Sequence, residues 1–74
     1  MHYQQFTTVI QRDGDWFVSW CPELDIASQG KTVEEARRNL IEALELFFEE
    51  ASPAEIQDRI HQETFITQVG INVA

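Results

Sequence analysis

Residues 20–36 read WCPELDIASQGKTVEEA, and this stretch decides the fold because it joins two strands to a helix with no linker between them. Pro22 has no backbone N–H group and therefore ends the strand that precedes it. Residues 24–29 leave room for one short strand, and Gly30 then supplies a turn. The stretch is therefore predicted to connect a sheet to a helix.

The helix after this turn is amphipathic. Thr32 and Glu35 form a capping box, in which each side chain satisfies a backbone N–H group of the other, so we expect the helix to begin at Val33. At about 100° per residue, its apolar side chains fall within one arc of roughly 160°, the width expected of a helix packed on a sheet. These side chains belong to Val33, Ala36, Leu40, Ile41, Ala43, Leu44, Phe47, Phe48 and Ala51.

Two elements are predicted beyond this helix. Ser52, Pro53 and Glu55 repeat the signals of a helix start, with serine as the N-cap and proline at the first helical position. They end the first helix and begin a short second one that runs to residue 60 or 61. Residues 64–73 then alternate and predict a last strand. Its apolar side carries Phe65, Val69, Ile71 and Val73, with Thr67 among them.

A hairpin is predicted at the start of the chain. Residues 3–12 and 16–21 alternate in strand-like composition, and the Asp-Gly-Asp between them forms the turn. A two-residue loop would pair Ile10 with Phe17, whereas a three-residue loop would pair Ile10 with Val18. We favour the three-residue loop because it groups apolar side chains on one core face. That face would carry Phe6, Ile10, Trp16, Val18 and Trp20.

The predicted order is β-β-β-α-(short α)-β, an α+β fold in which one mainly antiparallel sheet has a helix packed on one face. If the first three strands form a meander, the last strand runs parallel to the first and is reached by a right-handed crossover. That order matches the first half of an RNase H-like sheet. No linker, repeat or low-complexity tract divides the chain, so we expect residues 1–74 to form a single domain.

The size of the chain predicts self-association. A chain of 74 residues buries only about 60% of its surface on folding, which leaves a monomer marginally stable. Disulfides, a metal or self-association are the usual remedies. The single cysteine excludes an internal disulfide, so we expect a homodimer or a homotetramer.

The charge of the chain bounds its partners. Thirteen acidic against five basic residues give a formal charge of −8, which repels phosphate backbones, so we expect no direct binding to nucleic acid. A basic protein partner suits this charge, although a negative charge also simply keeps a small domain soluble. The chain has no run of 18 apolar residues and no signal peptide, which predicts a cytoplasmic protein without a membrane span.

Four carboxylates gather toward the end of the first predicted helix, at Glu42, Glu45, Glu49 and Glu50. There they oppose the helix dipole by about 0.3–1 kcal/mol each, and their spacing adds like-charge repulsion. Two interpretations stay open, a solvated face and a docking surface for a cationic partner. On the second interpretation these four residues are the candidate partner-binding site.

No set of residues argues for catalysis. A two-metal nuclease needs several carboxylates that converge from strand interiors, yet the first predicted strand holds none, and Asp13 and Asp15 belong to the turn. His2 and His61 lack the spacing of metal ligands, and Cys21 is interpreted as a small apolar filler. We therefore expect no enzyme, no cofactor and no metal site.

The runs CPEL at 21–24 and SQGKTVEEA at 28–36, with the Asp-Gly turn before them and the acidic helix after them, resemble the HicB-type antitoxin family of bacteria and archaea. The resemblance covers almost the whole chain. It implies an antitoxin with a partial RNase H-like fold. It also implies a small basic HicA-type partner, an mRNA-cleaving toxin with a double-stranded-RNA-binding-like fold, whose active site the antitoxin masks.

Many members of this family also carry a C-terminal helix-turn-helix or ribbon-helix-helix segment that binds the operator. This chain ends at Ala74, so we expect a binding module and not a repressor. The alternative hypothesis is an orphan oligomeric domain that serves as a structural or small-ligand-binding module. A residual metal-dependent nuclease is the third hypothesis.

Overall fold

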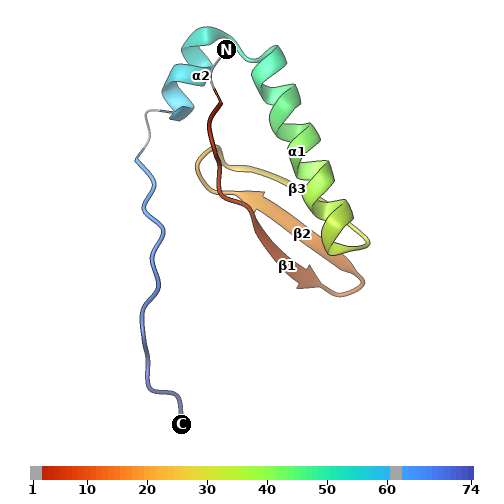
Figure 1. Ribbon diagram of the computed structural model, residues 1–74, viewed down its shortest axis with the longest axis vertical. Coiled ribbons are helices and arrows are strands. Elements are labelled where there is room, and N and C mark those ends of the chain that lie inside the picture. The colour runs from red at the N-terminus through yellow and green to blue at the C-terminus, as the bar shows by residue number, and fades with distance from the viewer. Residues whose placement is uncertain (1–2, 61–62) are drawn as a thin grey trace.

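The structure is a computed structural model that describes residues 3–60 and 63–74. Three strands, β1 (Val9–Asp13), β2 (Trp16–Cys21) and β3 (Ile26–Gly30), are followed by two helices, α1 (Val33–Glu50) and α2 (Pro53–Ile60). The strands form one antiparallel sheet in the order β1-β2-β3, and α1 packs on one face of it (Figure 1). The α+β fold predicted from the sequence is confirmed.

The β1–β2 hairpin turns through residues 14–15, because Asp13 is the last paired residue of β1. Gly14 has a φ of +63°, a left-handed conformation that glycine adopts without steric cost. In this register Ile10 pairs with Ser19, a pairing that neither predicted register gives. Both predicted registers are therefore wrong, because Asp13 belongs to the strand and not to the turn.

This register also decides which face of the sheet is core. Ser19 and Cys21 are fully buried, whereas Trp16 and Trp20 are 39% and 43% exposed. Because side chains alternate along a strand, the two tryptophans lie on the face opposite to Ser19. Ile10 pairs with Ser19 and therefore lies on the same face as Ser19. The predicted core face is therefore wrong in grouping Ile10 with Trp16 and Trp20.

The core beneath α1 is small. Its buried hydrophobic residues are Cys21, Leu24, Ala36 and Leu40, and the partly buried residues packed against them are Phe6, Ile26, Leu44, Phe47 and Phe48. The predicted apolar face of the helix is confirmed for the buried and partly buried helix residues just named. Two predicted core positions are wrong, because Val33, the first residue of the helix, is 48% exposed and Ile41, at the edge of the apolar arc, is 37% exposed.

The start of α1 lies directly against β3. A Cβ atom on Gly30 would come within 2.6 Å of the Ala36 nitrogen, so only glycine permits this approach. The buried hydroxyl of Ser19 donates a hydrogen bond of 2.7 Å to the carbonyl oxygen of Ala36. Asn39 Nδ2 donates another, of 2.8 Å, to the carbonyl oxygen of Gln29. These contacts hold α1 over β3 and β2 and leave β1 with little cover.

Both predicted helix starts are confirmed. The Glu35 N–H donates to Thr32 Oγ1 at 3.0 Å, and the Glu55 N–H donates to Ser52 Oγ at 3.1 Å. The carboxylate of Glu35 accepts its hydrogen bond from the backbone N–H of Lys31, at 2.9 Å. The capping box therefore differs from the predicted one on that side, where Thr32 was the expected donor.

Helix α2 is attached to the rest of the domain through Arg59. The guanidinium donates a hydrogen bond to the carbonyl oxygen of Leu24, and its Cζ atom lies 5.2 Å from the centre of the Phe47 ring. It also lies 4.0 Å from the carboxylate of Glu55, one turn earlier in the same helix. Arg59 thus joins α2 both to the β2–β3 connection and to the end of α1.

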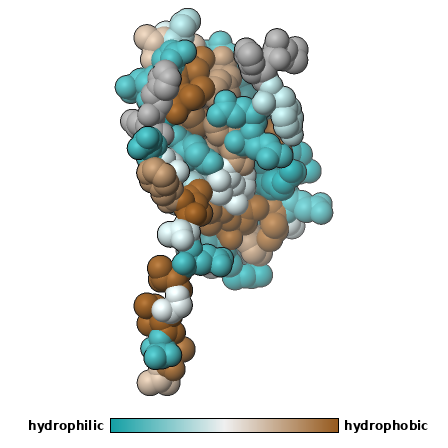
Figure 2. All heavy atoms as spheres, turned by 60° about the vertical axis from the view of Figure 1, so that its left-hand side comes forward, coloured by the Kyte–Doolittle hydropathy of each residue, from teal (hydrophilic) through white to brown (hydrophobic). Residues whose placement is uncertain are grey.

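The structure differs from the prediction over residues 63–74, which we call the C-terminal segment. Within the described ranges no strand pairing forms there, so the predicted last strand over 64–73 is wrong for the isolated chain. The segment is drawn out and leads away from the sheet (Figure 1), and its apolar side chains face solvent (Figure 2). Phe65 is 84% exposed, Val69 79% and Val73 87%.

We predict that Gly30→Ala lowers the free energy of unfolding by about 1–3 kcal/mol, because the added methyl group meets helix backbone that has no room to move. Chemical denaturation of the purified variant measures this loss. The matched control is Gln29→Ala, one residue earlier on the exposed side of β3, with an expected change below about 0.5 kcal/mol. Equal losses in the two variants would contradict the close packing at Gly30.

Candidate partner-binding surfaces

The four predicted partner-binding carboxylates are all exposed on the second half of α1. At about 100° per residue, Glu42, Glu45 and Glu49 fall within an arc of roughly 60°, whereas Glu50 lies roughly 80° further round. We call Glu42, Glu45 and Glu49 the acidic stripe. Within residues 3–60 and 63–74, no ion pair involves any of these four carboxylates. The structure thus brings three of them together and places Glu50 apart.

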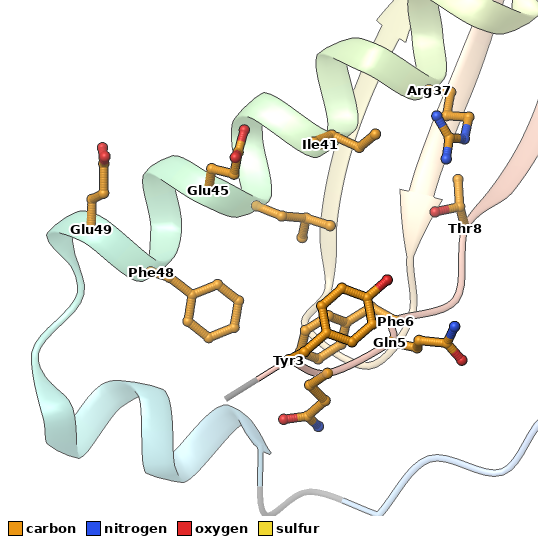
Figure 3. Close-up of a pocket in the computed structure, with 11 residues that line it drawn as sticks. Tyr3, Gln5, Phe6, Thr8, Arg37, Ile41, Glu45, Phe48 and Glu49 are labelled. Carbon is orange, nitrogen blue, oxygen red and sulfur yellow. The ribbon is translucent and has the colours of Figure 1, made fainter. Parts of the chain in front are cut away.

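A groove of about 1020 Å³ runs between α1 and residues 3–8, the segment that leads into β1. We call it the N-terminal groove (Figure 3). Its apolar lining comes from Tyr3, Phe6, Ile41, Leu44 and Phe48. Glu45 and Glu49 also border it, and Figure 3 shows their carboxylates directed away from the aromatic rings. The groove is therefore mainly apolar, with Glu45 and Glu49 on one side and Arg37 near Thr8.

Glu23 holds the segment that forms one wall of this groove. Its carboxylate accepts hydrogen bonds from the backbone N–H of Thr7, at 2.9 Å for Oε2, and from the Thr7 hydroxyl at 2.6 Å. Thr7 and Glu23 are 16 residues apart, so no local sequence pattern could have indicated this contact. Glu23 was therefore not among the residues predicted from the sequence, although it positions the segment that forms one wall of the groove.

Aromatic side chains join the same segment to the helix. The ring centres of Phe6 and Phe48 lie 5.7 Å apart, and those of Phe47 and Phe48 lie 5.2 Å apart with the rings nearly perpendicular. Tilted and edge-on pairs of this kind contribute about 0.5–1.5 kcal/mol beyond the area that they bury. Two of these packed rings, Phe6 and Phe48, line the groove.

The environment around Glu23 shifts two ionisable groups in opposite directions. Partial burial acts to raise the pKa of Glu23, but hydrogen bonds to the carboxylate from Thr7, from the Glu23 backbone and from Cys21 together outweigh burial and lower this pKa below its ordinary value. Burial raises the pKa of the Cys21 thiol, whose Sγ atom donates to the Glu23 carboxylate at 3.5 Å. The thiol is fully buried and protonated at neutral pH, as expected for an apolar filler.

The face of the sheet opposite α1 is a second uncovered surface. Val9, Trp16 and Trp20 are each about 40% exposed there, and Val18 lies between them, half-buried. Lys31 Nζ lies 4.0 Å from the centre of the Trp16 ring, a cation–π contact. We call these four apolar residues the open sheet face. The structure thus leaves this face of the sheet open, whereas the opposite face packs against α1.

Among the residues that the structure describes, the acidic and cysteine side chains do not assemble into a metal site. Over the part of the chain that the structure describes, no three His, Cys, Asp or Glu side chains lie close enough to hold a metal ion. Asp15 lies in the hairpin turn, as predicted, and Asp13 ends β1. His2 and His61, which the sequence analysis considered as ligands, lie outside the described residues.

The chain was compared with protein-family models, with curated proteins and with solved structures, and none of them matches it. No helix within residues 3–60 and 63–74 is both long enough and apolar enough to span a bilayer.

We predict that Glu23→Gln reduces the acid sensitivity of folding. A carboxylate with a lowered pKa stabilises the folded state above its ordinary pKa of 4.5, and this contribution is lost as the pH falls through the lowered value. At pH 7 the variant should therefore be less stable than the parent chain by about 1–2 kcal/mol. Urea denaturation at a series of pH values measures the difference, which should shrink toward zero in acid. Parallel curves at every pH would contradict the role assigned to Glu23.

Proposed function

We propose that this chain is an antitoxin-like binding module of the HicB type, which neutralises a small basic HicA-type mRNA-cleaving toxin by masking its active site. The proposal includes a partial RNase H-like fold, with the three antiparallel strands and α1 as its first half. The motif runs at 21–24 and 28–36, which carry the resemblance to that family, support it, and they form a strand end, a turn and a helix start in one continuous unit.

The observation that carries the proposal is the acidic stripe on α1. Its three carboxylates are exposed, and they lie in the half of the helix where carboxylates oppose the dipole. A basic partner would relieve both the repulsion between them and the unfavourable dipole interaction. Such charges also accelerate encounter with a cationic protein. In this proposal the chain is therefore the acidic, non-catalytic member of the toxin–antitoxin pair.

The decisive experiment is co-expression with a small basic HicA-type protein encoded beside this chain. The proposal expects a stable complex in pull-down and relief of the growth arrest that the toxin causes alone. Absence of both a complex and relief would overturn it. The apolar N-terminal groove supports the alternative, an orphan oligomeric domain with a structural or small-ligand-binding role, which that negative outcome would favour.

We predict that the double charge reversal Glu45→Lys with Glu49→Lys weakens toxin binding by about tenfold or more at low salt, because each replacement turns an attraction into a repulsion. Titration calorimetry at low and at physiological ionic strength measures the affinities, and screening should reduce the difference at higher salt.

The matched control for this reversal is Asp13→Lys with Asp15→Lys, which makes the same change in net charge at the β1–β2 hairpin turn. It should reduce the affinity much less if the acidic stripe is the contact surface. Equal losses in the two double variants would show that only the net charge matters. Unchanged affinity in the stripe variant would exclude this face of α1.

A further inference from the structure

We propose that the C-terminal segment is exchanged between two copies of the chain, so that residues 64–73 of each copy form a fourth strand on the free edge of β1 and beside the N-terminal groove of the other. The occupant of the groove is thus a second copy of this chain. The proposal does not rest on the antitoxin function.

The composition of the segment suits a buried strand and not a solvated tail. Its alternate residues form one apolar side, at Phe65, Val69, Ile71 and Val73, and these four are 75–87% exposed in the single chain. Glu63 is its only charged side chain. An extended segment of this kind, with an apolar side and unpaired backbone groups, is suited to add as a strand to an exposed sheet edge.

The receiving surface is present on the same molecule. β1 pairs only with β2 within the described ranges, so its other edge keeps free N–H and C=O groups. Residues 3–8, which lead into β1, form one wall of the N-terminal groove, and the second half of α1 forms the other. Ile41, Leu44 and Phe48 line that second wall. A strand added beside β1 would lay its apolar side chains toward these three residues.

A second copy can supply the strand edge and the apolar contacts that the C-terminal segment lacks in this conformation of the single chain. Thr64 lines a small pocket together with Gln4 and Phe6, but the residues after it lead away from α1 and from residues 3–8 of their own chain (Figure 1). Reciprocal exchange about a two-fold axis would bury two segments and two grooves at once. We estimate a total on the order of 1,500–2,500 Å², within the range of stable dimers.

Exchange would also add buried apolar contacts to a small core. Only Cys21, Leu24, Ala36 and Leu40 are buried hydrophobic residues within the described chain, too few to stabilise 74 residues comfortably. A borrowed strand would cover Ile41 and Phe48, which the isolated chain leaves partly in water. Because the segment is nearly uncharged, it approaches the groove without repulsion from Glu45 and Glu49.

The test is the molar mass of the full-length chain by light scattering across a dilution series. A mass of twice 8.6 kDa is expected for the parent chain. Val69→Asp with Ile71→Asp should raise the dimer dissociation constant by about tenfold or more, because it places two charges on the side that is buried. Gln68→Asp with Asn72→Asp adds the same charges to the opposite side of the segment and should change the constant much less.

Mixing two variants separates exchange from every other dimer. Ile41→Asp places a charge in the groove, and by itself this variant should dimerise as poorly as the Val69→Asp, Ile71→Asp chain. An equimolar mixture of the two should recover dimer, because one intact segment then meets one intact groove. Circular dichroism on each variant checks that α1 and α2 remain folded.

Three outcomes would overturn the proposal. A monomeric parent chain would show that the segment returns to its own β1 edge or stays free. A dimer that is indifferent to the Val69 and Ile71 replacements would place the contact elsewhere, with the open sheet face as the first candidate. Failure of the mixture to recover dimer would exclude reciprocal exchange.

Discussion

The close approach of Gly30 to Ala36 is the constraint on which the rest of the structure depends. Because β3 presents no side chain at this point, the first turn of α1 comes down onto the strand, and the Ser19 hydroxyl then reaches the Ala36 carbonyl. The helix is thereby committed to the β3 side of the sheet. The uncovered edge of β1 and the N-terminal groove follow from that position, since one helix cannot cover both edges of three strands. The surfaces available for partners are thus set by a glycine on the far side of the sheet.

Much of the fold could be predicted from local signals. Pro22, Gly30 and the caps at Thr32 and Ser52 each act within a few residues, and the structure places the helix starts where they indicate. The strand register could not be predicted in the same way. Apolar residues occupy both faces of the hairpin, so alternation fits several registers, and the choice depends on the hydroxyl of Ser19 finding a helix carbonyl 17 residues away. That information is tertiary.

The candidate site likewise has a part that could be predicted from local sequence and a part that could not. Exposure of the four carboxylates followed from the helix period, because each lies outside the apolar arc. The groove beside them could not be predicted, because one of its walls is held by the hydrogen bonds from Thr7 to Glu23, which are 16 residues apart in the sequence. The last strand was predicted from an alternation that is real, but a strand also needs a partner edge. The alternation shows that residues 64–73 can pair with a strand edge. It does not show which molecule supplies that edge.

The two tryptophans give the open sheet face a practical consequence. Trp16 and Trp20 are the only indole rings in the chain, and both are in contact with water while the domain is folded. Lys31 lies over one ring, and Asp25 accepts a hydrogen bond from the indole nitrogen of the other at 3.4 Å. Intrinsic fluorescence of this protein is therefore a poor gauge of whether its core is intact. It should instead change when another molecule binds the face of the sheet that α1 leaves uncovered.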